Sequence, residues 1–368
     1  MTKNNTHIAY FCPSLSWGGL EMNQLRNAEW MHNRGHKVVI LLQKGSRIHQ
    51  EASANGISVD FVQPHKKYFD FGKAAQLIKK IKQHNITHLI VRDPKDMSVC
   101  SLAKSWSKKK FFLAYFMEMQ IGIPKRDLLH TIRYSSFDLW SCPLPWLKKQ
   151  VKELTRFPSE KTLVIPSGLS LDRYFNAPER QEAKTLLDLD TNKEYIGLVG
   201  RFDEQKRQLL LLESFNQIKD KIHHDLVFLG ESTHGESDAY FDKLKEYVRE
   251  NKIEKRVHFR PFRPDVETFY SAIDVFVMAT KSETFGMVTI EAMAAGCKVV
   301  GSNQGGTVEI LNHGEFGELF ETGNAEDLSN KLMVSIANQD FDANAVKDEA
   351  RKYDAEIVCN KVETALGI

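Results

Sequence analysis

Residues 274–301 read DVFVMATKSETFGMVTIEAMAAGCKVVG, and this stretch holds two short apolar runs separated by a loop and a helical segment. The runs DVFVM (274–278) and KVVG (298–301) have the length and composition of buried strands, and AMAAG supplies a tight helix before the second run. Parallel strands need a crossover between them. The stretch therefore predicts a strand–helix–strand unit of a parallel sheet.

The same alternation extends in both directions along the chain. It reads HIAYFC (7–12), KVVILL (37–42), ISVDFV (57–62), THLIVR (87–92) and TLVIP (162–166) in the first half, and YIGLVG (195–200), DLVFLG (225–230) and VHF (257–259) in the second. A loop with Pro166, Gly168 and Pro178 separates the two series. We therefore predict an α/β fold of two Rossmann-like, doubly wound parallel-sheet domains that face each other across a cleft. The expected domains are residues 1–168 and 169–350, with a helix in 351–368 packing back on the first.

Length and composition are those of a globular chain. With 368 residues, of which 42% are apolar and 27% charged, it can form two cores, and a disordered or fibrous chain is excluded. The opening residues lack the apolar segment of a signal peptide and no stretch approaches a membrane span, so we expect a cytoplasmic protein. Five cysteines without a CxxC pair are expected to be reduced and buried.

The net charge of +2 hides a strong asymmetry. Residues 1–170 carry 26 Lys and Arg against 12 Asp and Glu, whereas residues 171–368 carry 24 against 36. A basic first half indicates an anionic partner: a membrane surface, a phosphorylated lipid or glycan, or a nucleic acid. A solvated basic surface without a partner is the alternative.

Ligands of open α/β sheets bind beyond the carboxyl ends of the strands, so the loops there are candidate sites. The first, PSLSWGGLEMNQ, places Gly18 and Gly19 at a helix start, where backbone N–H groups can approach an anion. The second, LVGRFDEQKRQ, places Arg201 directly after a strand and Lys206 five residues later, at the opening of the next helix. A guanidinium and an ammonium group on one loop suit a diphosphate.

The third loop lies in the stretch quoted first and carries Glu283 and Glu291, eight residues apart. The helix between them opens with the N–H groups of Phe285, Gly286, Met287 and Val288. These form an anion cradle flanked by two carboxylates that accept hydrogen bonds from hydroxyls, so one patch would hold phosphates centrally and sugar hydroxyls at its sides. A fourth loop, SNQGGTVEIL, adds Gly305 and Gly306 at another helix start.

These segments carry a resemblance to a known family. GRFDEQK (200–206), LVFLGE (226–231) and the stretch from YSAIDVFVM to GGTVEIL (270–311) resemble the donor domain of family-four GT-B glycosyltransferases, the retaining group with the E-x7-E motif. IPSGLSLDRYF (165–175) is similar to that family's domain linker. Over residues 1–165 the resemblance is looser and rests on the Gly-Gly loop and the GHKVVI strand.

In the second domain the resemblance implies a division of roles. Arg201 and Lys206 would hold the donor diphosphate and support catalysis together with Glu283. Glu291 would bind the ribose hydroxyls, and Glu283 would contact the hydroxyls of the transferred sugar. The N–H groups of residues 285–288 would contact phosphate and sugar.

In the first domain, which would face the acceptor, the resemblance implies that Gly18 and Gly19 close on the diphosphate. Many family members carry a histidine near the sugar and the acceptor. The corresponding stretch here reads FLAYFMEMQIG, and Glu118 stands closest to that place, which makes it a further candidate catalytic residue.

The activity that the resemblance implies is a retaining glycosyltransferase. It would move a sugar from a nucleotide-sugar donor, a UDP-sugar rather than a GDP-sugar, to a glycan or lipid-linked acceptor in cell-surface polysaccharide or lipopolysaccharide assembly. A nucleotide-sugar epimerase or a sugar-phosphate synthase on the same fold is the alternative. A nucleic-acid-binding protein is a more remote alternative. No nucleic acid is expected as a partner, because the chain has no RNP, KH or helix-turn-helix pattern.

No cofactor and no metal are expected, because two cations can offset the charge of the departing diphosphate. Asp188-Leu189-Asp190 has the spacing of the DxD metal motif of another glycosyltransferase fold. It lies before the first strand of the second domain, away from the expected cleft.

A membrane surface is a further expected partner. PWLKKQVKELTR (145–156) sets four apolar side chains among basic ones: Trp146, Leu147, Val151 and Leu154. Trp106 beside Lys108, Lys109 and Lys110 would add a second contact. This pattern suits a helix lying on an anionic membrane, at the inner face of the plasma membrane. The alternative is a helix packed on its own sheet with a solvated outer face.

Overall fold

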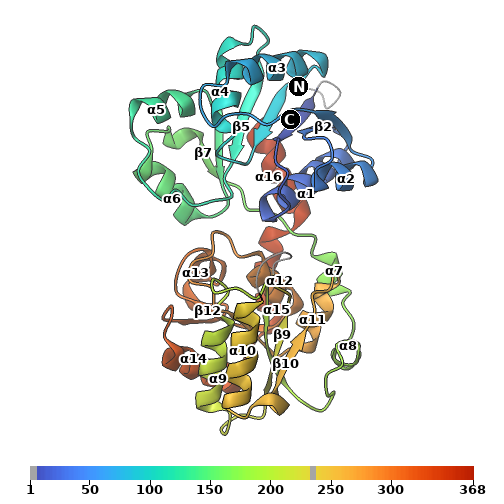
Figure 1. Ribbon diagram of the computed structural model, residues 1–368, viewed down its shortest axis with the longest axis vertical. Coiled ribbons are helices and arrows are strands. Elements are labelled where there is room, and N and C mark those ends of the chain that lie inside the picture. The colour runs from blue at the N-terminus through green and yellow to red at the C-terminus, as the bar shows by residue number, and fades with distance from the viewer. Residues whose placement is uncertain (1–5, 233–237) are drawn as a thin grey trace. The chain divides into compact units, whose positions relative to one another are not determined.

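The computed structural model describes residues 6–232 and 238–368, which form two compact units. The first unit comprises the chain up to Gly168 together with Ala355–Ile368, and the second comprises Leu169–Asp354. In Figure 1 the first unit runs from blue to green and includes the red helix α16 (Ala355–Leu366). Residues 1–5, which belong to the opening segment considered above, lie outside the described residues.

Each unit is built on a parallel sheet. Over the described residues the first sheet has seven strands in the order β3-β2-β1-β4-β5-β6-β7, and the second has six in the order β10-β9-β8-β11-β12-β13. The strands of the first sheet are β1 (His7–Cys12), β2 (Lys37–Leu42), β3 (Ser58–Phe61), β4 (His88–Val91), β5 (Phe112–Phe116), β6 (Leu139–Cys142) and β7 (Thr162–Val164). Those of the second are β8 (Tyr195–Val199), β9 (Asp225–Leu229), β10 (Val257–Arg260), β11 (Val275–Met278), β12 (Lys298–Ser302) and β13 (Glu318–Phe320). Two Rossmann-like parallel-sheet domains are thus confirmed.

The strands read as unbroken apolar runs because helices pack on the faces of both sheets. In the first unit these are α1 (Gly19–Asn33), α2 (Arg47–Ala54), α3 (Phe71–Gln83), α4 (Met97–Trp106), α5 (Leu128–Ser135), α6 (Pro145–Leu154) and α16. Fully buried Ile8 and Ile40 of the sheet share one core with Met31 of α1 and Val362 of α16. All five cysteines are buried and none forms a disulfide, as the composition predicts.

The second unit has its own core. Its helices are α7 (Asp172–Phe175), α8 (Arg180–Leu186), α9 (Gln208–Ile218), α10 (Ala239–Glu250), α11 (Val266–Ala272), α12 (Met287–Ala295), α13 (Gly306–Ile310), α14 (Ala325–Ala337) and α15 (Ala343–Ala350). Buried Leu211, Phe228, Val277 and Leu332 bring α9, β9, β11 and α14 into one cluster. This packing fixes the strand ends from which the candidate site is built.

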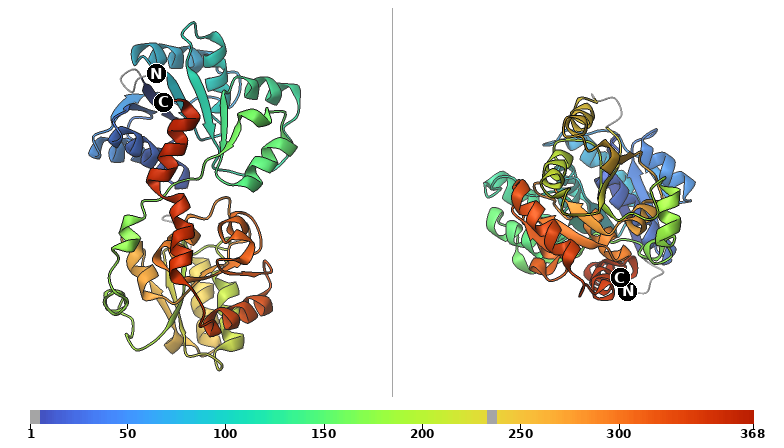
Figure 2. Two further views of the ribbon diagram at one scale, coloured as in Figure 1. Left: turned by 180° about the vertical axis from the view of Figure 1, so that it is seen from behind. Right: turned by 90° about the horizontal axis from the view of Figure 1, so that it is seen from below.

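The last helix belongs to the first unit although it follows the whole of the second. Figure 2 shows α16 beside α1 and the first sheet, and Glu363 accepts a hydrogen bond from Arg34 at 3.0 Å and contacts His36 at 2.8 Å. The division falls after Asp354, so the expected start at residue 351 is four residues early. Residues 351–354 stay with the second unit because the carbonyl of Tyr353 accepts from the N–H of Leu169 at 2.9 Å.

Helix α6 does not expose the apolar face that was expected to meet a membrane. Leu147 and Val151 are fully buried, and Trp146 and Leu154 are half-buried, so this helix packs on its own sheet. Trp106 remains half exposed and stacks on Phe71 with ring centroids 5.2 Å apart. None of the helices within 6–232 and 238–368 is long and apolar enough to cross a membrane.

Candidate functional site

The first turn of α12 forms the centre of the candidate site in the second unit. Gly286 caps this helix with φ +105°, a conformation that favours glycine, and both Gly286 and Phe285 are buried. The helix geometry leaves the N–H groups of its first residues, Met287 and Val288 among them, without partners inside the helix. These N–H groups and the helix dipole create a place for an anion.

The backbone of Glu283 is fixed against the next strand-end loop. Its carbonyl accepts from the N–H of Gly306 at 2.8 Å, and Glu283 and Gly305 form a parallel bridge. Gly305 has φ +68°, and a Cβ atom there would collide with the carbonyl oxygen of Glu283. Gly305 is therefore required for the two loops to meet, and this contact positions Glu283 beside the start of α12.

Lys206 reaches the side chain of Glu283. Its Nζ lies 3.3 Å from Oε2 of Glu283, and both side chains are partly exposed. The turn around Lys206 is held by Asp203, whose Oδ1 accepts from the N–H of Lys206 at 3.0 Å. Helix α9 starts at Gln208, so Lys206 lies in the turn before this helix rather than in its first residues. The structure thus places Lys206, the residue expected to contact the phosphates, against Glu283, the residue expected to contact the sugar.

Arg201 follows β8 on the same loop but extends into solvent. Its side chain is 60% exposed and lies 3.4 Å from Asp203. Gly200 before it packs on Gly230 so closely that a Cβ atom at Gly230 would collide with the carbonyl of Gly200. The strand-end loops of β8 and β9 are therefore rigidly joined, and Arg201 projects from a fixed base.

Glu291 lies one turn into α12 and is anchored by a tyrosine. The O–H of fully buried Tyr270, on α11, donates to Oε2 of Glu291 at 2.9 Å. Burial, and after it the neighbouring carboxylate of Glu291, raises the pKa of Tyr174 well above its ordinary value, so this phenol stays protonated. The hydrogen bond from Tyr270 thus sets the direction of Glu291, and neither Tyr270 nor Tyr174 was predicted from the sequence.

In the first unit, Gly18 is the N-cap of α1 and Gly19 its first residue. The N–H of Gly18 donates to Oε2 of the buried Glu21 at 3.0 Å. This N–H group, which was expected to meet a diphosphate, is thus occupied by a carboxylate of its own helix. Glu21 supplies negative charge at the N-terminus of α1, as a capping residue does.

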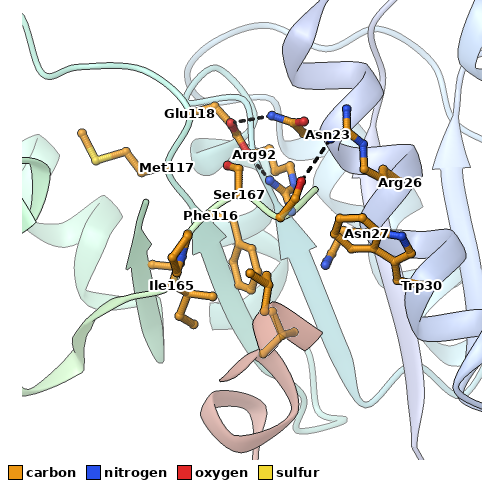
Figure 3. A pocket seen from close by; sticks show the side chains of 15 residues that line it. Asn23, Arg26, Asn27, Trp30, Arg92, Phe116, Met117, Glu118, Ile165 and Ser167 are labelled. Carbon is orange, nitrogen blue, oxygen red and sulfur yellow. Dashed lines mark hydrogen bonds and ion pairs between the residues drawn. The ribbon is translucent and has the colours of Figure 1, made fainter. Parts of the chain in front are cut away.

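Glu118 follows β5 and is held in a small pocket (Figure 3). It forms an ion pair with Arg92, which follows β4, and Oε2 accepts from Nδ2 of Asn23 on α1 at 3.1 Å. Less than a tenth of each side chain of the ion pair is exposed. The side chain of Glu118 is thus fixed at the carboxyl ends of β4 and β5 by Arg92 and Asn23.

The DxD-like tripeptide does not form part of this arrangement. The side chain of Asp188 is fully exposed and lies 3.6 Å from Arg260. In the described ranges, which omit 1–5 and 233–237, no three His, Cys, Asp or Glu side chains gather as metal ligands.

Comparison with known protein families assigns both halves of the chain. Residues 17–173 match the family described as Glycosyltransferase Family 4, and residues 179–353 match Glycosyl transferases group 1. The chain belongs to the family-four glycosyltransferases. The resemblance inferred from the sequence is confirmed, and the boundary between the two matches lies close to the division between the two units of the chain.

The curated relatives of this chain are distant. It is 24% identical over 295 residues to the mannosylfructose-phosphate synthase of Agrobacterium fabrum, an alignment that covers 77% of this chain and 62% of the relative. It is 32% identical over 178 residues to a lipopolysaccharide core biosynthesis mannosyltransferase of Rhizobium meliloti, covering 47% of this chain and 49% of the relative. The alignments thus span about half to three fifths of these relatives.

Solved structures share the fold over nearly the whole chain. A glycosyltransferase from Rickettsia africae superposes with a TM-score of 0.86 at 19% identity, covering 98% of both chains. An Anabaena protein solved in complex with UDP gives a TM-score of 0.84 at 19% identity, covering 98% of this chain and 100% of that one. These similarities establish the GT-B fold.

Proposed function

We propose that this protein is a retaining glycosyltransferase that moves a sugar from a UDP-sugar to a glycan or lipid-linked acceptor in cell-surface polysaccharide or lipopolysaccharide assembly. The observation that carries the proposal is the placement of Lys206 and Glu283 together beside the first turn of α12, with Glu291 one turn further on. The relatives named for lipopolysaccharide synthesis and the UDP-bound neighbour support the acceptor class and the nucleotide.

In the proposed reaction the bond between the anomeric carbon and the diphosphate oxygen breaks before the acceptor bond is fully formed. Lys206, Arg201 and the first N–H groups of α12 would take up the charge that grows on the diphosphate. Glu283 would accept hydrogen bonds from the transferred sugar, and Glu291 from the ribose. Glu118, held by Arg92, would stand on the acceptor side.

Thermal unfolding of the full chain with UDP-, GDP- and ADP-sugars tests the donor class. A ligand that binds only the native state raises the apparent melting temperature, so a UDP-sugar should raise it most. Equal or larger shifts with GDP-sugars would overturn the nucleotide assignment. Analysis of the products then separates transfer to a glycan from epimerisation of the donor or synthesis of a free sugar phosphate.

We further propose that the protein acts at an anionic membrane surface through α5 rather than α6. Leu128 and Ile132 of α5 and Ile123 before it are 71%, 60% and 62% exposed. Lys125 and Arg126 lie between them in the chain. Apolar side chains among basic ones match an interfacial helix on anionic lipid.

A further inference from the structure

A second cavity in the first unit has no role in the donor chemistry. It has a volume of about 250 Å³ and lies at the carboxyl ends of β4, β5 and β6, where ligands of such sheets bind. Met117 and Met119, the neighbours of Glu118 in sequence, both line it. Glu118 itself lines the smaller pocket of Figure 3, which shares Met117 with this cavity.

One wall of the cavity is aromatic. Trp140 meets Tyr115 and Tyr134 edge to face, with ring centroids 4.9 and 5.0 Å apart, and Tyr68 lies on the same lining. Such rings combine an apolar body with a polar edge. A sugar ring has the same two qualities, because its C–H groups are apolar and its hydroxyls hydrogen-bond. The volume suits one sugar residue rather than an oligosaccharide.

Two buried N–H groups on this lining have no partner. They are Nε of Arg133 and Nε1 of Trp140, and these two residues are 6% and 2% exposed. The other end of the Arg133 guanidinium donates to the carbonyl of Pro94, which fixes its plane. Buried donors are nearly always satisfied, so these two N–H groups mark unpaired polar positions within the cavity wall.

The charges around the cavity are mainly positive. Lys67, Lys95 and Lys125 line it together with Arg133, and Asp93 is the acidic residue among the lining side chains. The guanidinium of Arg133 also lies over the ring of Tyr68, 5.5 Å from its centroid. Several cations around one small cavity suit a tetrahedral dianion, whose oxygens accept from more than one donor.

We propose that this cavity binds a phosphorylated sugar, which is the acceptor residue or the residue next to it. The inference rests on the proposed transferase function and adds to it the chemical class of the acceptor. The aromatic wall holds the ring, and the lysines with Arg133 hold the phosphate. The phosphosugar can be free in solution or part of a lipid, since the recognised chemistry is the same.

Calorimetry on the full chain tests this with glucose 6-phosphate, glucose and glucuronate as probes, each with and without UDP. Glucose 6-phosphate should bind in both cases, with glucose and glucuronate at least about tenfold weaker. Equal binding of all three probes would overturn the proposal. So would the absence of binding to both glucose 6-phosphate and monophosphoryl lipid A. UDP binding is measured separately, so its loss would count against the donor site and not against this cavity.

Lys125→Ala should weaken glucose 6-phosphate binding about tenfold, because one charge-assisted contact is removed. Lys79→Ala, which removes an exposed lysine of α3 outside the cavity, is the matched control and should not change it. Arg133→Lys tests whether the buried guanidinium contributes to the binding of glucose 6-phosphate. The UDP affinity of each variant is measured to check that the variant is folded. Equal effects of Lys125→Ala and Lys79→Ala would contradict the site.

Phosphatidylcholine vesicles containing monophosphoryl lipid A, a phosphorylated sugar lipid, distinguish the two sources. Co-sedimentation that exceeds that with phosphatidylglycerol vesicles of equal charge, and that excess being lost in Lys125→Ala, would assign the site to a lipid-held sugar phosphate, because the α5 surface would bind both kinds of vesicle alike. Binding of glucose 6-phosphate without this excess would assign it to a soluble one. An excess that is unchanged in Lys125→Ala would contradict the lipid-held source.

Discussion

Nζ of Lys206 lies 3.3 Å from Oε2 of Glu283, and each side chain is 26% exposed. This pair joins the loop after β8 to the loop before α12, next to the first N–H groups of that helix. In the proposed function the carboxylate would keep the ammonium group close to the diphosphate. Lys206 would then be shared between the carboxylate and the phosphate, and Glu283 would contact the sugar.

Lys206→Ala should lower the turnover rate on the order of a hundredfold, because negative charge on the leaving group grows in the transition state. Donor affinity should fall less. Lys221→Ala, which removes an exposed lysine of the same unit, is the control. Steady-state kinetics with a UDP-sugar measures both quantities, and a loss confined to donor affinity would refute the assignment. Arg201→Ala should behave in the same way as Lys206→Ala.

Glu283→Gln and Glu291→Gln should affect different parts of the donor. Glu291→Gln should weaken the binding of bare UDP through lost ribose contacts, and Glu283→Gln should reduce discrimination among UDP-sugars while UDP affinity is kept. Calorimetry with UDP and with two UDP-sugars checks this. If Glu283→Gln abolished UDP binding and Glu291→Gln left it unchanged, the two roles would have to be exchanged.

Transfer should proceed in EDTA, because two cations and a helix N-terminus are available to the diphosphate. The measurement is the initial rate in chelator against the rate with added Mg²⁺ or Mn²⁺. Activity lost in EDTA and restored by either ion would show that a metal is needed. It would also bring Asp188 and Asp190 back into consideration.

Replacing Leu128 and Ile132 with serine should abolish binding to anionic vesicles at low salt, because these side chains supply the exposed apolar surface of α5. Leu186→Ser, which removes a half-exposed leucine of the second unit, should have no effect. Flotation at low and high salt measures the binding. Retention of binding by the double variant would exclude α5 as the contact.

Glu363→Gln should destabilise the docking of α16 by about 1–2 kcal/mol at neutral pH. The Arg34 guanidinium that hydrogen-bonds Glu363, and then His36, lowers the pKa of this carboxyl from 4.5 to about 2. The stabilisation is therefore present above pH 4.5 and is lost as the pH falls toward 2. Urea unfolding of wild type and variant should differ at pH 7 and converge near pH 2. A difference independent of pH would contradict this assignment.

The parallel-sheet fold could be predicted because its strands are buried on both faces and therefore read as apolar runs. HIAYFC and KVVILL coincide with β1 and β2, and the helix expected within 351–368 is α16, which begins at Ala355. Strand β13 was not predicted. It has three residues, of which one is fully buried, and these are too few to show an apolar run or an alternation of apolar and polar residues. The sequence left two alternatives open for helix α6, because the spacing of Leu147 and Val151 suits a membrane and a sheet equally well, and the structure shows these side chains buried.

The donor-side candidates could be named because they fall in two short ordered motifs. The partners of Glu118 could not be named, since Arg92 and Asn23 are 26 and 95 residues away in the chain. Only the meeting of the β4 and β5 ends with α1 brings them together. Tyr270 was likewise hidden, because its apolar neighbours on α11 make it read as a core residue.

The place of α16 in the first core has a consequence for synthesis on the ribosome. The first 168 residues emerge with their sheet strands complete, but the surface that Val358 and Val362 will cover stays open while the second unit is being translated. During this interval an apolar strip along α1 and the sheet is accessible to chaperones and to other nascent chains. The core of the first unit can therefore be completed only after the second unit has been translated.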